Sequence, residues 1–127
     1  MAKRLSTSQL ERKFAAAWVV RCPDLPYVEQ FALPAWVEWA QQRKAQGLVK
    51  NARSMVADFA WPDAQVAVEV QGATWVTGGH STGTGIARDA AKSNLAQLNG
   101  WVLVALTAEM INPDWLSRLE EGVRSRL

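Results

Sequence analysis

The chain is poor in the residues from which disulfide frameworks and zinc clusters are built. Among its 127 residues there is one cysteine, Cys22, and one histidine, His80. A single cysteine cannot close an internal disulfide, and these two residues cannot supply the four ligands of a structural zinc site. Both kinds of scaffold are therefore excluded, and the cysteine usage favours a reducing compartment.

Long apolar runs are also missing. The longest one, residues 14–20, is far shorter than the roughly 20 residues that span a bilayer. The first residues, MAKRLSTSQ, carry charge but lead into no apolar core of the kind found in export signals. We therefore expect a cytoplasmic protein without a membrane partner.

The remaining composition is that of one domain over residues 1–127. A hydrophobic fraction of 49 % is enough for one core in a chain of this length. The net charge is only +2, although the pI is about 9.0, because 14 basic residues nearly balance 12 acidic ones. This balance permits a nucleic-acid partner without requiring one.

Helical periodicity and capping signals predict four helices. Ser8 and Glu11 have capping-box spacing in front of a first helix that ends near residue 21. The other three are a helix from Pro34 that stops at Gly47, one over residues 86–99, and one that begins at Pro113 behind an Asn112 cap. The side chains expected to face inward on the second and fourth helices are Trp36, Val37, Ala40, Trp115, Leu119 and Val123.

Extended segments are expected between these helices. They are residues 27–33, a hairpin over 56–72, a short third strand at 74–77, and a strand over 101–106. The last is an unbroken apolar run, which is typical of a strand buried on both faces. We therefore expect an α/β (α+β) domain with a mixed central sheet flanked by helices.

The hairpin segment, VADFAWPDAQVAVEVQG, carries the most information about function. Side chains in a strand alternate between faces, so Ala67, Glu69 and Gln71 share one face and the three neighbouring valines share the other. Proline and aspartate at 62 and 63 supply the turn. If the strands pair symmetrically about residues 63 and 64, Asp58 lies opposite Glu69, with Cβ atoms about 5 Å apart.

Two carboxylates placed opposite each other should repel. A divalent cation such as Mg²⁺, which binds one or two carboxylates together with waters, would remove that repulsion. The alternative is that this face is only the solvated side of a half-buried sheet.

The order of elements and these residues resemble the PD-(D/E)XK nuclease superfamily. Asp58 on one strand and Glu69-Val70-Gln71 on the next match its motif, with glutamine at the lysine position, and Glu11 lies in the first helix, where several branches keep an acidic residue. The stretches EVQGATW and GGHSTGTGIARDAAKSNLAQLNGW are similar to small phage and bacterial endonuclease domains related to very-short-patch-repair and Holliday-junction-resolving enzymes. The resemblance implies a single-domain restriction-endonuclease-like core in αβββαβα order.

The resemblance also implies a metal-dependent DNA endonuclease for branched or mismatched DNA, with a role in repair or recombination. Asp58, Glu69 and the backbone carbonyl of Val70 would hold Mg²⁺ or Mn²⁺, which activates a water molecule. Glu11 is either a further carboxylate of this site or only the capping residue of its helix. His80 is either a general acid or phosphate contact, or a bystander in a polar loop.

Glutamine at position 71 departs from the motif, because an amide can neither carry the lysine's charge nor act as an acid or base. Glutamine does replace this lysine in some superfamily members. Alternatively, Lys92 supplies the charge from the neighbouring helix. Asp89 lies three residues before Lys92 on the same helix face, so a surface ion pair is the competing interpretation.

Contacts to DNA phosphate are expected from basic and hydroxyl side chains outside the motif. The candidates are Arg43, Lys44, Lys50, Arg53, Thr82, Thr84 and Arg88, which could equally form a solvated surface. The glycine-rich stretch GGHSTGTG matches neither a P-loop nor a dinucleotide fingerprint. Trp61 and Trp75 could stack on bases or pack in the core.

A second class of function is kept beside the nuclease. Because Gln71 replaces the motif lysine, the chain could be a non-catalytic nucleic-acid-binding protein on a nuclease scaffold. Against this, a protein that binds polyanions gains nothing from two carboxylates facing phosphate. Cutting of the resolvase type would also call for a symmetric homodimer.

Overall fold

The computed structural model describes residues 7–51, 54–72 and 83–127. Its helices are α1 (Thr7–Arg21), α2 (Pro34–Ala45), α3 (Gly83–Leu98) and α4 (Pro113–Arg124), with a short 3-10 helix, η3 (Ala108–Met110). Its strands are β1 (Val28–Phe31), β2 (Ala57–Trp61), β3 (Val66–Gln71) and β4 (Val102–Thr107). No helix in these ranges is both long enough and apolar enough to cross a membrane.

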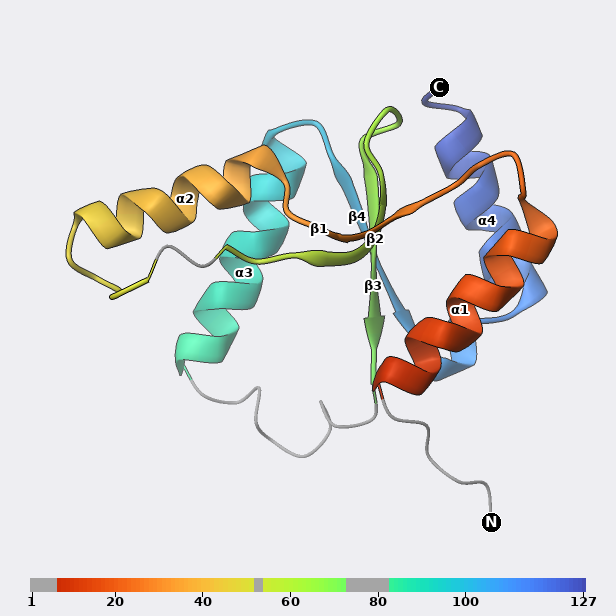
Figure 1. The fold of residues 1–127 in the computed structure, drawn as a ribbon, viewed down its shortest axis with the longest axis horizontal. Coiled ribbons are helices and arrows are strands. Elements are labelled where there is room, and N and C mark those ends of the chain that lie inside the picture. Colours follow the sequence, from red (N-terminus) through yellow and green to blue (C-terminus); the bar gives the residue numbers. More distant parts are fainter. Residues whose placement is uncertain (1–6, 52–53, 73–82) are drawn as a thin grey trace, which may run out of the picture.

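The elements form three layers, with the sheet in the middle (Figure 1). Helices α1 and α4 lie on one face of the sheet, and α2 and α3 lie on the other. The strand order is β1-β2-β3-β4; the first two pairings are antiparallel, and β4 runs parallel to β3. Helix α3 makes the crossover that a parallel pair needs. The predicted mixed sheet flanked by helices is confirmed, with α2 standing between the first and second strands.

The hairpin has the predicted register. Phe59 pairs with Val68, Ala60 with Ala67 and Trp61 with Val66, which is symmetric about residues 63 and 64. The turn is closed by hydrogen bonds from Ala64 N to the Trp61 carbonyl (3.0 Å) and from Gln65 N to the Pro62 carbonyl (3.1 Å). This register brings the end of β2 that carries Asp58 level with Glu69 on β3.

The two faces of the hairpin differ in side-chain size, and this difference sets the packing. Valines of β3 face the first core, where α1 contributes Phe14 and Trp18; the Phe14 ring lies 4.7 Å from the ring of Phe59. The other face presents three alanines, Ala57, Ala60 and Ala67, to the second core. Small side chains there leave room for the large indole of Trp36 from α2, which is fully buried.

The predicted helix boundaries are largely confirmed. Asn112 accepts a hydrogen bond from Trp115 N (2.9 Å), which makes it the N-cap of α4, and Pro113 follows in the first turn. Gly47 after α2 and Gly100 after α3 have φ angles of +74° and +80°, a conformation that favours glycine at the end of a helix. Ser8, predicted as a cap, lies inside α1, which already includes Thr7.

Two burial predictions are wrong. Strand β4 is not buried on both faces: Leu106 is buried, whereas Val102 and Ala105 are exposed. The reason is that β4 is the edge strand, so the central positions belong to β2 and β3. Trp115 does not face inward, since 37 % of it is exposed; Leu116 takes its place on the buried stripe of α4 with Leu119 and Val123. The strand expected at residues 74–77 lies outside the described residues.

We expect Asn112→Ala to lower the free energy of unfolding by about 1 kcal/mol, because the Trp115 amide loses its cap. Urea denaturation followed by circular dichroism measures the change. Asn112→Asp keeps the acceptor for the Trp115 amide but loses the hydrogen bond of 2.6 Å that Asn112 Nδ2 donates to the Glu109 carbonyl, so its loss should be smaller than that of Asn112→Ala. Equal losses in both variants would show that the cap contributes nothing.

Candidate active site

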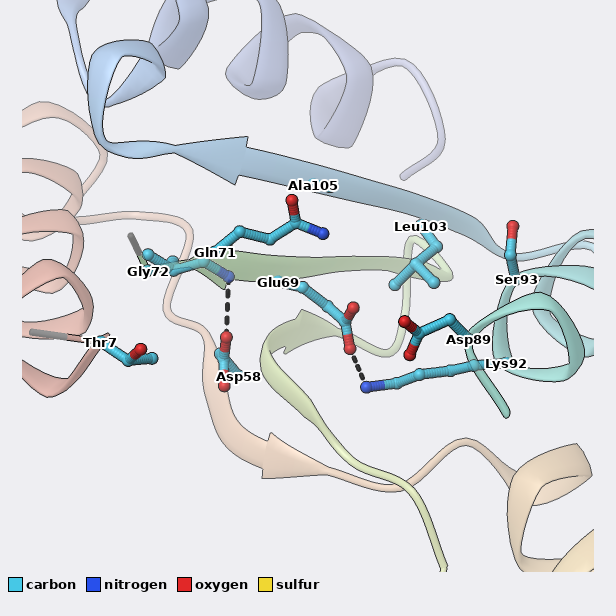
Figure 2. Close-up of a pocket in the computed structure, with 11 residues that line it drawn as sticks. Thr7, Asp58, Glu69, Gln71, Gly72, Asp89, Lys92, Ser93, Leu103 and Ala105 are labelled. Atoms are coloured by element: carbon cyan, nitrogen blue, oxygen red, sulfur yellow. Dashed lines mark hydrogen bonds and ion pairs between the residues drawn. The ribbon is translucent and has the colours of Figure 1, made fainter. Parts of the chain in front are cut away.

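A cavity of about 560 Å³ opens where β2 and β3 meet α3 (Figure 2). Asp58 from β2, Glu69 and Gln71 from β3, and Lys92 from α3 all line it. The remaining lining residues are Thr7, Val70, Gly72, Asp89, Ser93, Leu103 and Ala105. The structure therefore brings four of the predicted catalytic residues into one site.

Asp58 is held by the backbone of the next strand. The amide of Val70 donates a hydrogen bond of 2.7 Å to Asp58 Oδ2. The pairing of β2 with β3 ends at Phe59 and Val68, so the Asp58 carboxylate accepts from a backbone amide just beyond the paired part of the two strands. This contact fixes one oxygen of the Asp58 carboxylate.

Glu69 forms an ion pair with Lys92, drawn as a dashed line in Figure 2. Only 22 % of the glutamate side chain and 16 % of the lysine side chain are exposed. The lysine ammonium also donates a hydrogen bond of 2.8 Å to the Val56 carbonyl. Lys92 therefore has partners outside its own helix, and Asp89 lines the same cavity.

The electrostatics of Lys92 follow from this position. Burial lowers the pKa of the lysine ammonium, and the nearby negative charge of Asp58 partly opposes that shift. The Lys92 ammonium pairs with Glu69 and lies near the charge of Asp58, so it offsets the repulsion predicted between these two carboxylates. The sequence hypothesis that a lysine reaches this place from the neighbouring helix agrees with the geometry.

Glu11 lies on the other side of Asp58, in a second cavity of about 230 Å³. Burial, together with a hydrogen bond to the Asp58 carboxylate and its charge, raises the pKa of Glu11 to about 7. Gln30 Nε2 donates a hydrogen bond of 3.3 Å to Glu11 Oε1. Glu11 is therefore a neighbour of Asp58 and not merely a helix-capping residue.

Sequence analysis did not assign four residues to this site, namely Thr7, Gln30, Trp36 and Gly72. Gln30 has a φ angle of +48°, rare for a residue other than glycine, at the place in β1 level with Asp58. Gly72 is buried against Thr7, and a β-carbon there would collide with the threonine side chain. Trp36 contacts Lys92 from the second core. Only Gly72 had a local signal, a glycine directly after a buried strand.

Of the predicted DNA contacts, those that the structure describes do not line the cavity. Lys44 and Lys50 are exposed at and beyond the far end of α2, where the Arg43 guanidinium lies 4.8 Å from the Trp39 ring centroid. Arg88 is exposed on α3. His80, Arg53, Thr82, Trp75 and the side chain of Thr84 lie outside what the structure describes.

Trp61 is a core residue and not a stacking platform for bases. It is buried, and its Nε1 donates a hydrogen bond of 3.0 Å to the Leu25 carbonyl. Its ring centroid lies 4.7 Å from that of Trp18. The packing alternative is therefore the right one for this tryptophan.

Comparison with known proteins gave no match among family models, curated proteins or solved structures. An inference about function must therefore be drawn from the geometry and chemistry of the cavity.

We expect the free energy of unfolding to fall between about pH 4.5 and pH 7 in metal-free protein, and Glu11→Gln to remove much of this fall. The folded-state pKa of Glu11 is raised from 4.5 to about 7, so the folded protein holds this proton more tightly than the unfolded chain. The resulting stabilisation is complete below the unfolded pKa and is lost as the pH rises through the folded pKa.

Urea denaturation at pH 4.5, 5.5, 6.5 and 7.5 in EDTA measures this dependence. Glu121→Gln, at an exposed position of α4, is the matched control and should keep the wild-type profile. If Glu11→Gln and Glu121→Gln gave the same profile, Glu11 would not be the titrating group.

Proposed function

We propose that the chain is a metal-dependent DNA endonuclease that hydrolyses phosphodiester bonds. One observation carries this proposal: two carboxylates from neighbouring strands, Asp58 and Glu69, share a cavity with the largely buried ammonium of Lys92. Carboxylates bind a hard divalent cation, and a lysine beside them suits a phosphate group in the same cavity. A simple surface ion pair consists of two charged groups, whereas Asp58, Glu69 and Lys92 all line this one cavity.

The donor groups of the cavity fit Mg²⁺ or Mn²⁺. Asp58, Glu69 and the Val70 carbonyl would hold the cation. Within residues 7–51, 54–72 and 83–127 there is no group of three His, Cys, Asp or Glu side chains suited to a metal ion. Mg²⁺ does not require such a group, because it is commonly bound through one or two carboxylates and keeps several waters. When bound, it would lower the pKa of a water molecule and offset charge on the scissile phosphate.

The chain's own side chains would divide the remaining work. Lys92 would orient the attacking water or offset charge that develops on the phosphate, as the motif lysine does in the superfamily that the sequence resembles. Gln71 is exposed at the same cavity and can hydrogen-bond to water or phosphate, but it cannot supply charge. Glu11, with its raised pKa, is placed to hold a proton next to Asp58.

The topology also supports this proposal. With α2 counted as an insertion between the first two strands, the remaining order is αβββαβα, as expected for that superfamily. The carboxylates stand on the second and third strands, and Lys92 stands on the crossover helix. We propose branched or mismatched DNA, as met in repair and recombination, as the substrate, with exposed basic residues such as Lys44 and Arg88 contacting phosphate.

A second candidate is a non-catalytic nucleic-acid-binding protein on the same scaffold. The observation in its favour is that an amide replaces the motif lysine while Lys92 already neutralises Glu69. Both candidates predict binding to DNA. They differ in whether divalent metal brings about cleavage.

We expect wild-type protein to cleave DNA in Mg²⁺ or Mn²⁺ but not in EDTA, and Asp58→Asn or Glu69→Gln to abolish cleavage. Each substitution removes an anionic oxygen that the cation requires while keeping the shape of the side chain. Branched, mismatched, duplex and single-stranded DNA are incubated with each protein and resolved on denaturing gels. Asp63→Asn in the hairpin turn is the matched control and should cleave normally.

The nuclease proposal fails if wild-type protein cleaves none of these substrates in either metal. Retained binding under those conditions would leave the non-catalytic candidate. Normal cleavage by both carboxylate variants would place the active site elsewhere.

We expect Lys92→Ala to lower the single-turnover rate about a hundredfold, the usual scale for a group that orients water or transfers a proton. DNA affinity should change little, because the charge acts mainly in the transition state. Gln71→Ala should lower the single-turnover rate by a smaller factor than Lys92→Ala. Lys13→Ala on α1 is the matched lysine control, and wild-type activity in Lys92→Ala would exclude Lys92 from catalysis.

A further inference from the structure

We propose that Trp36 is the positioning residue for Lys92, holding both the backbone and the ammonium of this lysine against the cavity. The proposal rests on the proposed function for its effect on rate, but the contacts themselves involve only residues of the chain. Trp36 lies on α2 and is fully buried in the second core. It is not one of the residues that line the cavity.

The indole of Trp36 reaches Lys92 at two points. Its Nε1 donates a hydrogen bond of 3.0 Å to the Lys92 carbonyl. The lysine Nζ lies 5.1 Å from the centroid of the same ring, within the range of a cation–π interaction. One side chain therefore contacts both ends of the lysine residue.

These contacts address a specific difficulty. A lysine side chain has four rotatable bonds and high rotamer entropy, so an ammonium placed by Glu69 alone would remain loosely defined. The Val56 carbonyl supplies a third fixed contact at 2.8 Å. The ring face, the carbonyl and the carboxylate together leave the ammonium one position, and the small alanines of β2 and β3 allow the indole to reach it.

The backbone hydrogen bond has a further effect. Lys92 lies in the interior of α3, where a carbonyl ordinarily accepts only from the amide four residues later. Its second lone pair is available, and the indole N–H uses it. This bond ties α3 to α2 at the residue whose side chain enters the cavity. Trp18 differs, because its indole N–H donates to the Leu25 carbonyl on the other side of the sheet.

The test compares Trp36→Phe with Trp18→Phe. Each removes a fully buried indole N–H that donates to a carbonyl, at 3.0 Å and 2.8 Å respectively, but only the first touches Lys92. We expect Trp36→Phe to slow single-turnover cleavage roughly three- to tenfold, the scale of one hydrogen bond, with DNA affinity unchanged. Trp18→Phe should leave the rate unchanged at temperatures where both variants are folded.

A second measurement needs neither metal nor activity. The metal-free proteins are treated with an amine-acylating reagent, and the acylation rate of Lys92 is followed by mass spectrometry. We expect this rate to rise several-fold in Trp36→Phe and to remain at the wild-type value in Trp18→Phe, since only the first change frees the lysine. Lys13 serves as the internal reference.

If Trp36→Phe fails to fold, Trp36 can be replaced by 3-benzothienylalanine, which has sulfur in place of the indole N–H. This replacement removes the same hydrogen bond and preserves the size of the ring. Unchanged Lys92 acylation in either Trp36 variant would overturn the proposal, as would an equal change in Trp18→Phe. If the wild type lacks nuclease activity but Lys92 acylation still rises, the proposed function fails and the positioning role stands.

Discussion

The ammonium group of Lys92 lies where a charge would be costly without partners, since little of its side chain reaches solvent. Its partners on the hairpin or directly before it are Glu69, the Val56 carbonyl and, at longer range, Asp58, and the centroid of the Trp36 ring of α2 lies 5.1 Å from it. Because Lys92 itself is on α3, satisfying this charge holds the helix against the ends of β2 and β3. The same contacts place both carboxylates at one cavity, so the site and the packing of α3 depend on one another.

The difference between the faces of the sheet makes this arrangement possible. Valines on β3 fill the core beneath α1 and α4, whereas alanines of β2 and β3 face α2 and α3. Indole rings fill the space left by the alanines. One of these rings, that of Trp36, packs in the second core and also contacts Lys92. Core packing and the position of a charged group are therefore coupled through a single side chain.

Asp58 lies between a basic neighbour, Lys92, and an acidic neighbour, Glu11. On one side it lies near the Lys92 ammonium, and on the other it shares a hydrogen bond with Glu11. The amide of Val70 fixes its carboxylate between them. The pKa of Lys92 is lowered and the pKa of Glu11 is raised. Opposite pKa shifts of neighbouring groups are typical of sites that transfer protons. In the proposed nuclease, this would put cationic stabilisation and a proton-holding carboxyl on opposite sides of one metal ligand.

The sequence alone determined the features that depend on neighbouring residues. Alternation and the turn at Pro62 gave the register that brings Asp58 level with Glu69, and the asparagine–proline pair gave the start of α4. These signals are reliable because strand alternation, turn geometry and capping are set by backbone sterics and hydrogen bonds over a few residues. The same signals gave no way to decide that Trp115 is exposed and Leu116 buried, since both fit a helical stripe.

Only the tertiary structure decided which charges meet. Spacing along the helix offered Asp89 as the partner of Lys92, and capping-box spacing offered a complete explanation of Glu11. Packing of α3 on the hairpin instead pairs Lys92 with Glu69, and packing of α1 beside β1 and β2 brings Glu11 to Asp58. The exposure of β4 likewise follows from its place at the edge of the sheet. Local spacing fixes which groups can meet within one element, whereas the strength of a contact between elements depends on distance and burial that long-range packing alone sets.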